Sequence, residues 1–439
     1  MISSIERNTT CNNQLLVSST QALNVDPAKT FDIAIVGGGI VGLTLAALLK
    51  DSGLSIAVVE AQSQSVAAAK GQAYALHLIS SRIFSGIGVW ADIAPQVEPF
   101  KQVRLSDADY PHRVDFQPAD LNTEVLGHVA EHGVLLRALQ NFLQSCENVT
   151  WFCPAEVTQT HCNQGGVRVE LSPVQSDSPV NGINLPTTVQ AKLLIGADGS
   201  RSPIRTKAGI STHGWQYWQS CVVVTVATEK PHHNTAYERF WPSGPFAILP
   251  LSGNRCRIVW TSPHAEAERI LNLDEPQFLQ ELSQRFGTQM GQLSLLSRPF
   301  LFPARLMHTQ AYSGQRLALI GDAAHTCHPV GGQGLNLGIR DAAALAEVLQ
   351  TAHQRGEDIG SQAVLKRYQN WRSWENWATL AFTDFLDRLF SNQWFPLVVG
   401  RRLGLRVMQK LPFLRIAALR FMAGLSGRVP QIARLESNS

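Results

Sequence analysis

The sequence predicts an α/β fold in which an antiparallel sheet is inserted into a frame of alternating strands and helices, with further helices at the C-terminal end. Two observations carry this prediction. Residues 31–59 read as a strand, a glycine-rich turn, a helix and a second strand, and residues 215–262 contain several strand-like runs separated by turns. A chain of 439 residues that is 44% hydrophobic and 16% charged has enough apolar material for two or three layers around a core.

The bulk composition excludes several classes of protein. The net charge is only +3, so nucleic acid is not an expected partner. The seven cysteines form no CxxC pair, so no metal site or redox dithiol is predicted, and their scattered, odd number fits a reducing compartment. Residues 1–30 are polar and lack the basic start and apolar core of a secretory signal, so we expect a disordered extension. No apolar run reaches the ~18–20 residues of a membrane span.

The first motif is a dinucleotide fingerprint. A strand runs into Gly37, Gly39 and Gly42 in G-x-G-x-x-G spacing, and a helix and a second strand that ends on Glu60 follow. Gly37 permits the tight turn, Gly39 lets the backbone approach a pyrophosphate, and Gly42 lets helix and strand pack closely. The helix N-terminus offers N–H donors, and Glu60 suits ribose hydroxyls rather than a 2′-phosphate. The arrangement predicts FAD or NAD, and a purely structural turn is the alternative.

Two further segments of the first half carry candidate ligands. Residues 125–139 have apolar residues at helical spacing and include His132, which could touch a dinucleotide or lie on a solvated helix face. A strand ends at Gly196-Ala197-Asp198-Gly199, and a helix entry with basic residues follows. The flanking glycines favour a close approach of Asp198 to a ligand, and the alternative is that Asp198 caps the helix.

The middle of the chain is predicted to form an antiparallel sheet. Its strand-like runs are separated by turns at 242–244 and 252–254. A sheet inserted into an α/β frame is a reasonable wall for a substrate cavity. The candidate lining residues are aromatic, although each taken singly is more typical of a core position: Trp215, Tyr217, Phe240, Trp241 and Trp260.

A second ligand-binding segment lies almost three hundred residues after the fingerprint. Residues 319–336 contain an apolar run, a Gly-Asp pair with Asp322, a turn at Pro329 and three glycines that open a helix. Such a segment gives one carboxylate to a polar chain and aims backbone N–H groups at an electron-rich ring. Together with the fingerprint it predicts one flavin held by both ends of the chain. For His325 and His328, which flank the ring segment, we expect structural roles rather than a proton relay.

These motifs together resemble a known family. The fingerprint, Gly196-Ala197-Asp198-Gly199 and Gly321-Asp322-Ala323-Ala324-His325 match, in order and spacing, the three motifs of class A flavoprotein aromatic hydroxylases. Four more segments narrow the resemblance to the UbiH/UbiF/VisC hydroxylases of quinone biosynthesis, over about residues 30–430: 126–129, 214–219, 328–336 and 341–345. One departure is Gln72, a position at which many family members carry Arg.

The resemblance implies a fold and its division into domains. The fold would be a Rossmann-like FAD-binding domain of the class A flavoprotein hydroxylase type, with an inserted antiparallel β-sheet substrate domain and C-terminal helices. The implied parts are an extension (1–30), the FAD-binding domain (31–110, 126–213 and 306–350), the substrate domain (111–125 and 214–305) and the C-terminal helices (351–439).

The resemblance also implies roles for residues. No catalytic side chain is identified, and the segment that would face the flavin ring contains Pro329, Gly331, Gly332, Gln333 and Gly334. The implied cofactor-binding residues are Gly37, Gly39, Gly42, Glu60, His132, Asp198, Asp322, Pro329, Gly332, Gly334, Leu335 and Asn336. The substrate pocket would include Trp215, Tyr217, Phe240 and Trp260.

The implied activity is FAD-dependent hydroxylation of an aromatic ring. NAD(P)H would reduce FAD, O₂ would add to give a flavin C4a-hydroperoxide, and a polyprenyl phenol or quinol precursor of ubiquinone or a plastoquinone-type quinone would take one oxygen atom. The protein would orient the ring and exclude water. Two alternatives stay open. One is a monooxygenase or reductase of the same fold acting on another phenolic or isoprenoid substrate, and the other is a non-catalytic flavin-binding subunit of a biosynthetic complex.

The C-terminal segment is strongly basic. From Arg388 onward it has nine Lys and Arg residues and one acidic residue, Glu436. Apolar residues lie among these charges in two candidate helices that Leu411-Pro412 separates. Basic amphipathic helices favour contact with a membrane surface or a biosynthetic complex, at roughly 1 kcal/mol per basic residue near anionic lipid. The alternative is that the helices pack on the FAD domain and that their basic side chains are exposed to solvent. We expect a cytoplasmic chain, with peripheral contact at the inner face of the membrane.

Overall fold

The apolar runs of the first half form an eight-stranded sheet with a parallel centre. The computed structural model describes residues 30–108, 110–174 and 188–434, so most of the extension expected over 1–30 lies outside the described residues. The strand order is β18 (Ser313–Gly314), β19 (Leu317–Leu319), β11 (Thr188–Gly196), β1 (Thr30–Val36), β2 (Ile56–Val59) and β8 (Val149–Phe152), with β10 (Val167–Pro173) and β9 (Ala155–Cys162) as an antiparallel extension of β11.

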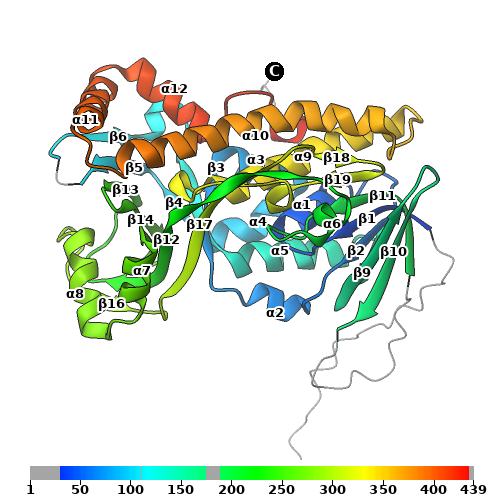
Figure 1. The fold of residues 1–439 in the computed structure, drawn as a ribbon, viewed down its shortest axis with the longest axis horizontal. Helices are drawn as coiled ribbons and strands as arrows, with labels where there is room; N and C mark the ends of the chain where they lie inside the picture. The colour runs from blue at the N-terminus through cyan, green and yellow to red at the C-terminus, as the bar shows by residue number, and fades with distance from the viewer. Residues whose placement is uncertain (1–29, 109, 175–187, 435–439) are drawn as a thin grey trace, which may run out of the picture.

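Helices cover this sheet because parallel strands need crossover connections that pack on its faces. The first helix, α1, packs against both α5 and α9, and the buried side chains of these helices and of β1 form the largest core of the molecule. Figure 1 shows these helices beside the strands. The helices of this part are α1 (Ile40–Leu48), α2 (Gln64–Ala68), α3 (Leu78–Ile87), α4 (Trp90–Ile93), α5 (His132–Gln144), α6 (Pro203–Lys207) and α9 (Gln333–Gln354).

A small sheet changes the expectation for residues 125–139. Helical spacing predicted a helix there, but the first part is strand β7 (Gly127–Glu131), and α5 begins only at His132. The reason is tertiary, because β7 pairs on both sides, with β3 (Ala73–His77) and with β4 (Glu98–Phe100). Local spacing does not report such pairing.

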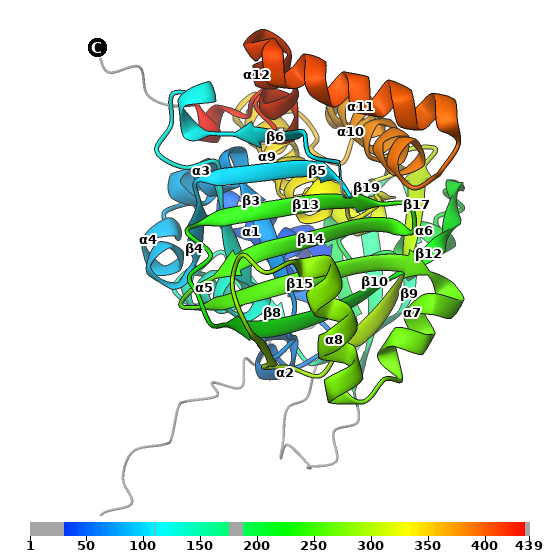
Figure 2. The same cartoon turned by 90° about the vertical axis from the view of Figure 1, so that its left-hand side faces the viewer.

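The middle of the chain forms most of a sheet with nine strands among the described residues, which is antiparallel as predicted except where β13 and β5 run parallel. The strand order is β20 (His325–Thr326), β17 (Phe300–Thr309), β12 (Thr212–Thr228), β15 (Arg255–Pro263), β14 (Gly244–Leu251), β13 (Thr235–Trp241), β5 (Gln102–Asp107) and β6 (Arg113–Phe116), with β16 (Leu293–Leu295) on β12. Helices α7 (His264–Leu271) and α8 (Glu275–Phe286) lie on one face, visible in Figure 2. The sheet includes β5, so it takes in residues that the sequence assigned to the first part of the FAD-binding domain.

Three C-terminal helices complete the fold. The longest, α10 (Gln362–Phe390), packs along α9 and runs across the molecule in Figure 1. It is followed by α11 (Phe395–Lys410) and α12 (Pro412–Met422), which lie beyond β5 and β6 at the top of Figure 2. Within residues 30–108, 110–174 and 188–434, no helix is both long and apolar enough to cross a membrane.

Candidate functional site

A cavity of about 900 Å³ lies where the two large sheets and the C-terminal helices meet. Its inner end is formed by the N-terminus of α1, by β3 and by the segment around Asp322, and its walls by the nine-stranded sheet. Its outer end is formed by α10, α11 and α12, where exposed Phe385, Gly400 and Gly404 line it. The volume lies toward the upper end of the range for small-molecule sites.

The glycine fingerprint is required by the packing around it. Gly37 has φ +112°, and a Cβ there would lie 2.3 Å from the carbonyl oxygen of Ala197. A Cβ at Gly42 would lie 2.1 Å from the carbonyl oxygen of Gly37, so α1 could not approach β1 with any larger residue. Gly39, by contrast, has no atom within 4 Å of a Cβ position and lines the cavity at the start of α1. The backbone is therefore accessible to a ligand there.

Glu60 is placed beside the same turn by β2. Its Oε2 accepts the N–H of Gly38 at 2.7 Å, and its Oε1 accepts the N–H of Gln62 at 2.8 Å. A carboxylate has about four lone-pair sites, so both oxygens can accept a further hydrogen bond. The half-buried side chain can hold the glycine turn and a ligand hydroxyl together.

One carboxylate oxygen of Asp198 caps the helix that follows, and the other makes no hydrogen bond to the described residues. Its Oδ2 accepts the N–H of Ile204 at 3.1 Å, in the first turn of α6. Its Oδ1 is buried and has no hydrogen-bond partner among the described residues. Burial raises the pKa of this carboxyl. The sequence left open whether Asp198 caps a helix or binds a ligand. The side chain caps α6 and still has one oxygen that can accept a hydrogen bond from a ligand.

Asp322 presents its carboxylate to the cavity from the short helix η3 (Gly321–Ala323). No hydrogen bond to this carboxylate is found among the described residues. Surrounding protein raises the pKa of Asp322 by desolvation, and His325 partly offsets this. Across the cavity, the Tyr74 hydroxyl donates to Gln72 Oε1 at 2.8 Å and lies 3.1 Å from His132 Nδ1. Gln72, the departure from the family pattern, is therefore tied to the cavity wall.

The segment after Pro329 brings a helix N-terminus to the cavity. Gly331 and Gly332 have φ +67° and +61°, a left-handed conformation that glycine adopts without strain. The long helix α9 starts at Gln333 with no side-chain cap, and Gly334 and Leu335 line the cavity with it. Its first N–H groups and its positive dipole end can therefore serve an electron-rich ligand.

Asn336 lies behind this segment and outside the cavity lining. Its Oδ1 accepts from His77 N at 2.9 Å and from Ser80 Oγ at 2.7 Å, while its Nδ2 donates to the carbonyls of Ala75 and Gly332, both at 2.7 Å. With these bonds, Asn336 joins β3 and α3 to the glycine segment. Its side chain therefore positions the backbone of Ala75 and Gly332, two residues that line the cavity.

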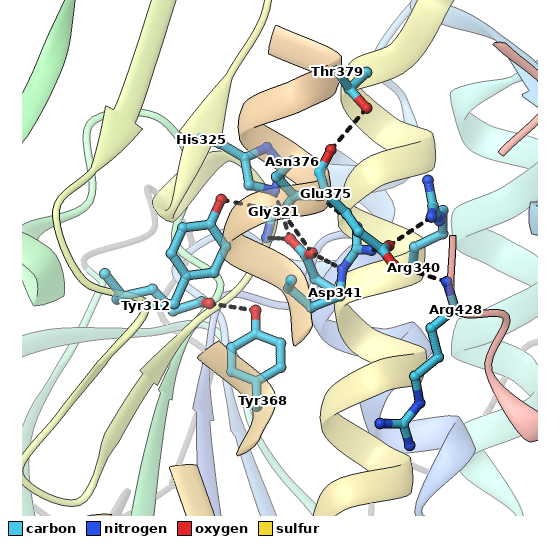
Figure 3. A network of polar contacts seen from close by, with 12 residues as sticks. Tyr312, Gly321, His325, Arg340, Asp341, Tyr368, Glu375, Asn376, Thr379 and Arg428 are labelled. Carbon is cyan, nitrogen blue, oxygen red and sulfur yellow. Dashed lines mark hydrogen bonds and ion pairs between the residues drawn. The ribbon is translucent and has the colours of Figure 1, made fainter. Parts of the chain in front are cut away.

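A buried network, drawn in Figure 3, fixes η3 against α9 and α10. Asp341 accepts hydrogen bonds from Gly321 N at 3.1 Å, His325 Nε2 at 2.6 Å, Arg372 Nε at 2.8 Å and Asn376 Nδ2 at 2.9 Å. Burial alone would raise the pKa of Asp341, but His325 and Arg372 hold it well below its usual range. The network sets the position of Asp322, the residue next to Gly321.

Comparison with known proteins identifies the family. The profile described as FAD binding domain matches residues 30–383. Relatives include the uncharacterized protein slr1300 of Synechocystis, 49% identical over 93% of this chain and 96% of that protein. The ubiquinone hydroxylase UbiL of Rhodospirillum rubrum is 35% identical over 95% of each chain. The 3-demethoxyubiquinol 3-hydroxylase of Escherichia coli is 35% identical over 90% of this chain and 98% of its own.

The chain belongs to the UbiH/UbiF/VisC-like family of FAD-dependent hydroxylases. Solved structures agree at the level of the fold. The p-nitrophenol 4-monooxygenase PnpA of Pseudomonas putida superposes with a TM-score of 0.74 at 19% identity, over 91% of this chain and 99% of that one. An HpxO variant of Klebsiella pneumoniae complexed with FAD gives 0.70 at 18% identity, over 90% and 99%.

This hydroxylase is an FAD-dependent aromatic-ring monooxygenase, with NAD(P)H as reductant and O₂ as co-substrate. The observed geometry fits the cofactor. Gly39 opens to the cavity, Asp322 faces it without a protein partner among the described residues, and the uncapped end of α9 lines it. The class A hydroxylase fold predicted from the sequence is confirmed.

The hydroxylase places only one of its four predicted substrate-pocket residues on the cavity wall. Phe240 lines the cavity and stacks on Phe390 at 4.0 Å between ring centroids. Trp260 lies on the opposite face of the sheet, in the core with α7 and α8, because neighbouring residues of a strand point to opposite faces. Tyr217 is buried and donates to Asp384 Oδ1 at 2.7 Å, and Trp215 is exposed; neither lines the cavity.

The two histidines of the ring segment are both buried and engaged with protein. His325 is bonded to Asp341 and stacks on Tyr312. His328 Nε2 lies 3.7 Å from Asp387 Oδ1, and its ring meets that of Tyr217 edge-on. Burial lowers the pKa of His328 to about 3. One ring nitrogen of each histidine has no hydrogen-bond partner among the described residues, and their structural roles stay a prediction.

Sequence reasoning missed Glu238. This residue lies on β13 between Ala236 and Phe240, and all three line the cavity. In the sequence, Glu238 is an acidic residue two positions from Ala236 and from Phe240, so the three share one face of a strand. That spacing points to the cavity only when the face of the sheet that lines the cavity is known.

Proposed function

We propose that this hydroxylase acts on the ring of a polyprenyl phenol or quinol precursor in ubiquinone or plastoquinone-type quinone biosynthesis. The observation that carries this proposal is the shape of the cavity, which extends from Asp322 to exposed residues of α10 and α11. Its outer walls are apolar and include Leu389, Leu405 and Met408. An aromatic head can sit at the inner end while an isoprenoid tail extends between the C-terminal helices. The relatives named for ubiquinone hydroxylation support the same substrate class.

The cofactor would be held from both ends of the chain. The ADP half would lie on the N-terminus of α1, with Gly37, Gly39 and Gly42 shaping the turn and Glu60 accepting from the ribose. Asp322 would bind the ribityl chain. The flavin ring, which supplies the oxygen-activating chemistry when bound, would face Pro329 and the N–H groups at the start of α9. Asp198 and His132 would complete the contacts of FAD or of NAD(P)H.

The protein's own contribution is to orient the ring and to keep water from it. The face of the nine-stranded sheet that lines the cavity is largely apolar, with Val223, Ala247 and Leu249 among its residues. Water that reaches the reacting centre would divert oxygen to peroxide instead of product. A dry wall on the substrate side therefore favours productive turnover.

We further propose that α11 and α12 meet the membrane surface or a partner through apolar contacts. Five of the nine basic residues from Arg388 onward are already in ion pairs inside the chain: Arg388, Arg401, Arg402, Arg415 and Arg428. Unpaired positive charge is thus smaller than the sequence suggested. Large apolar side chains are nevertheless exposed, with Phe395 at 76% and Phe413 at 66%. A substrate with an isoprenoid tail resides in the bilayer, and the outer end of the cavity lies between these helices.

The proposed function is tested by the lipid quinones of a strain that lacks the gene. We expect loss of the mature quinone and accumulation of a prenylated precursor one oxygen short, measured by mass spectrometry. Wild-type protein should restore the quinone, whereas Asp322→Ala should not. An unchanged quinone profile in the deletion strain would contradict the proposal and favour another phenolic substrate. A flavin-containing protein with no substrate-stimulated NAD(P)H oxidation would favour the non-catalytic subunit.

A further inference from the structure

The cavity contains one carboxylate that the cofactor site does not use, that of Glu238. It projects from β13, where the residue is paired with Ala247 of β14 on one side and with Leu105 of β5 on the other. All three positions line the cavity. The Glu238 carboxyl interacts with the backbone N–H of Gly331, in the segment that would face the flavin ring. The carboxylate is therefore at the reacting end of the cavity.

No cation neutralises this carboxylate among the described residues. Charged or titratable side chains of the elements around the cavity have other partners. Arg401 of α11 pairs with Asp107 and donates to carbonyls of α10, and Asp387 of α10 accepts from Ser391 and faces His328. Cys221 of β12 lies against Thr261. Burial raises the pKa of Glu238 to about 7, and the Gly331 backbone only partly offsets this.

We propose that the carboxylate of Glu238 accepts the proton of the substrate's ring hydroxyl as the ring is hydroxylated. This rests on the proposed function, because it assigns the group that activates the phenol. The O–H bond of the phenol breaks, its proton moves to a carboxylate oxygen, and the electron pair stays on the phenol oxygen and is delocalised into the ring. The ring carbon is then a stronger nucleophile toward the oxygen atom that O₂ supplies, with NAD(P)H as the electron source.

The proton balance closes without another reactant. When the ring becomes aromatic again, the attacked carbon loses its hydrogen as a proton, which goes to the second oxygen atom of O₂ as that atom leaves as water, and the original phenol oxygen takes its proton back from Glu238. A group that both accepts and returns a proton works best when its pKa lies near the working pH, and the apolar cavity gives Glu238 that property. A carboxylate that only stabilised the fold would be expected to have a cation or several N–H donors beside it, as Asp341 has.

The test compares Glu238→Gln and Glu238→Leu with wild type and with the matched control Glu268→Gln. Glu268 is an exposed residue of α7, away from the cavity. The first readout needs no turnover. Binding of 2-geranylphenol and of its methyl ether to the oxidised holoenzyme is followed by flavin fluorescence. A charge-assisted hydrogen bond predicts that wild type and control prefer the phenol by about 10-fold or more, and that Glu238→Leu shows no preference.

The second readout is turnover as a function of pH. We expect Glu238→Gln to lose about 10²- to 10⁴-fold in kcat, with the flavin content unchanged, and to lose the acid limb that wild type shows near pH 7. Equal phenol preference in all four proteins, or a Glu238→Gln variant within twofold of wild type in kcat, would overturn the assignment. So would loss of flavin from both variants, which would make Glu238 a cofactor ligand. If wild type bound but did not oxidise geranylphenol, the proposed function would fail, while the binding preference would still decide the role of Glu238.

Discussion

Replacing Asp341 by Asn should destabilise the flavin end of the cavity more than any exposed carboxylate replacement. The carboxylate accepts four hydrogen bonds, from Gly321, His325, Arg372 and Asn376. Each oxygen of Asp341 accepts from two of these donors, so an amide keeps one acceptor oxygen and turns its N–H₂ group toward the other two donors. The Arg372 guanidinium, which is 1% exposed, would keep only Glu375 as a carboxylate partner.

The expected cost follows from this burial. Breaking a buried ion pair by removing one partner costs about 3–5 kcal/mol. For a chain of this length, with an unfolding entropy of about 2.1 cal/mol/K per residue, that corresponds to a fall in Tm of roughly 3–5 °C. The pKa of Asp341 is lowered in the folded chain, so its contribution is fully present above about pH 4, where the unfolded carboxyl is ionised, and is lost as the pH falls further.

The assay is thermal unfolding of the holoenzyme together with its flavin content after gel filtration. The matched control is Asp358→Asn, which removes the ion pair between the exposed Asp358 carboxylate and Arg316 and should cost about 1 kcal/mol. We expect Asp341→Asn to lower Tm below the control and to lose flavin, because Gly321 and the adjacent Asp322 are held by this network. A variant with the Tm and flavin content of the control would refute the reasoning.

Further predictions concern the cofactor, the tail path, the membrane and acid stability. Asp322→Ala should abolish tight FAD binding, and full flavin after gel filtration would contradict its assignment. Gly404→Phe should raise KM for a long-tailed prenyl phenol but not for a short-tailed one, since Gly404 lines the outer end of the cavity; equal effects on both would exclude this tail path. Changing Phe395 and Phe413 together to Ser should weaken the binding of the protein to liposomes in a flotation assay, whereas added salt should leave the binding of wild type unchanged. Unchanged binding of the double variant would argue against the apolar contact. Burial lowers the pKa of His77 to about 4, so the folded chain keeps it neutral. Stability linked to His77 should therefore be present above about pH 6.5 and be lost as the pH falls toward 4, and a His77→Asn variant with an unchanged acid slope would contradict this.

The cofactor half of the site could be read from the sequence because its signals are local. Gly37, Gly39 and Gly42 share one turn at the start of α1, where Gly42 packs on Gly37, and Asp322 comes three residues after the end of β19. The contact of Gly37 with Ala197 is the exception, because it joins residues far apart in the sequence. Asn336 was predicted to bind the cofactor, but it lies outside the cavity lining and its side chain bonds to His77, Ser80 and Ala75, residues more than 250 positions earlier. No local pattern reveals such bonds.

The substrate half could not be read in the same way, because it depends on which face of a sheet meets the cavity. Trp260 and Val259 are neighbours on β15, yet only Val259 lines the cavity. The charge of the C-terminal helices was misjudged for a related reason. Arg401 bonds to Asp107, 294 residues away, so a count of local charges overstates what solvent meets.

The central claim is that this chain uses bound FAD to insert one oxygen atom into the ring of a prenylated phenol. The most direct test is mass spectrometry of 2-geranylphenol after incubation with the holoenzyme, NAD(P)H and ¹⁸O₂. We predict a hydroxylated product that carries one ¹⁸O atom on the ring, formed by wild type and not by Asp322→Ala. NAD(P)H consumption that yields only peroxide, or a product whose added oxygen comes from water, would contradict the account.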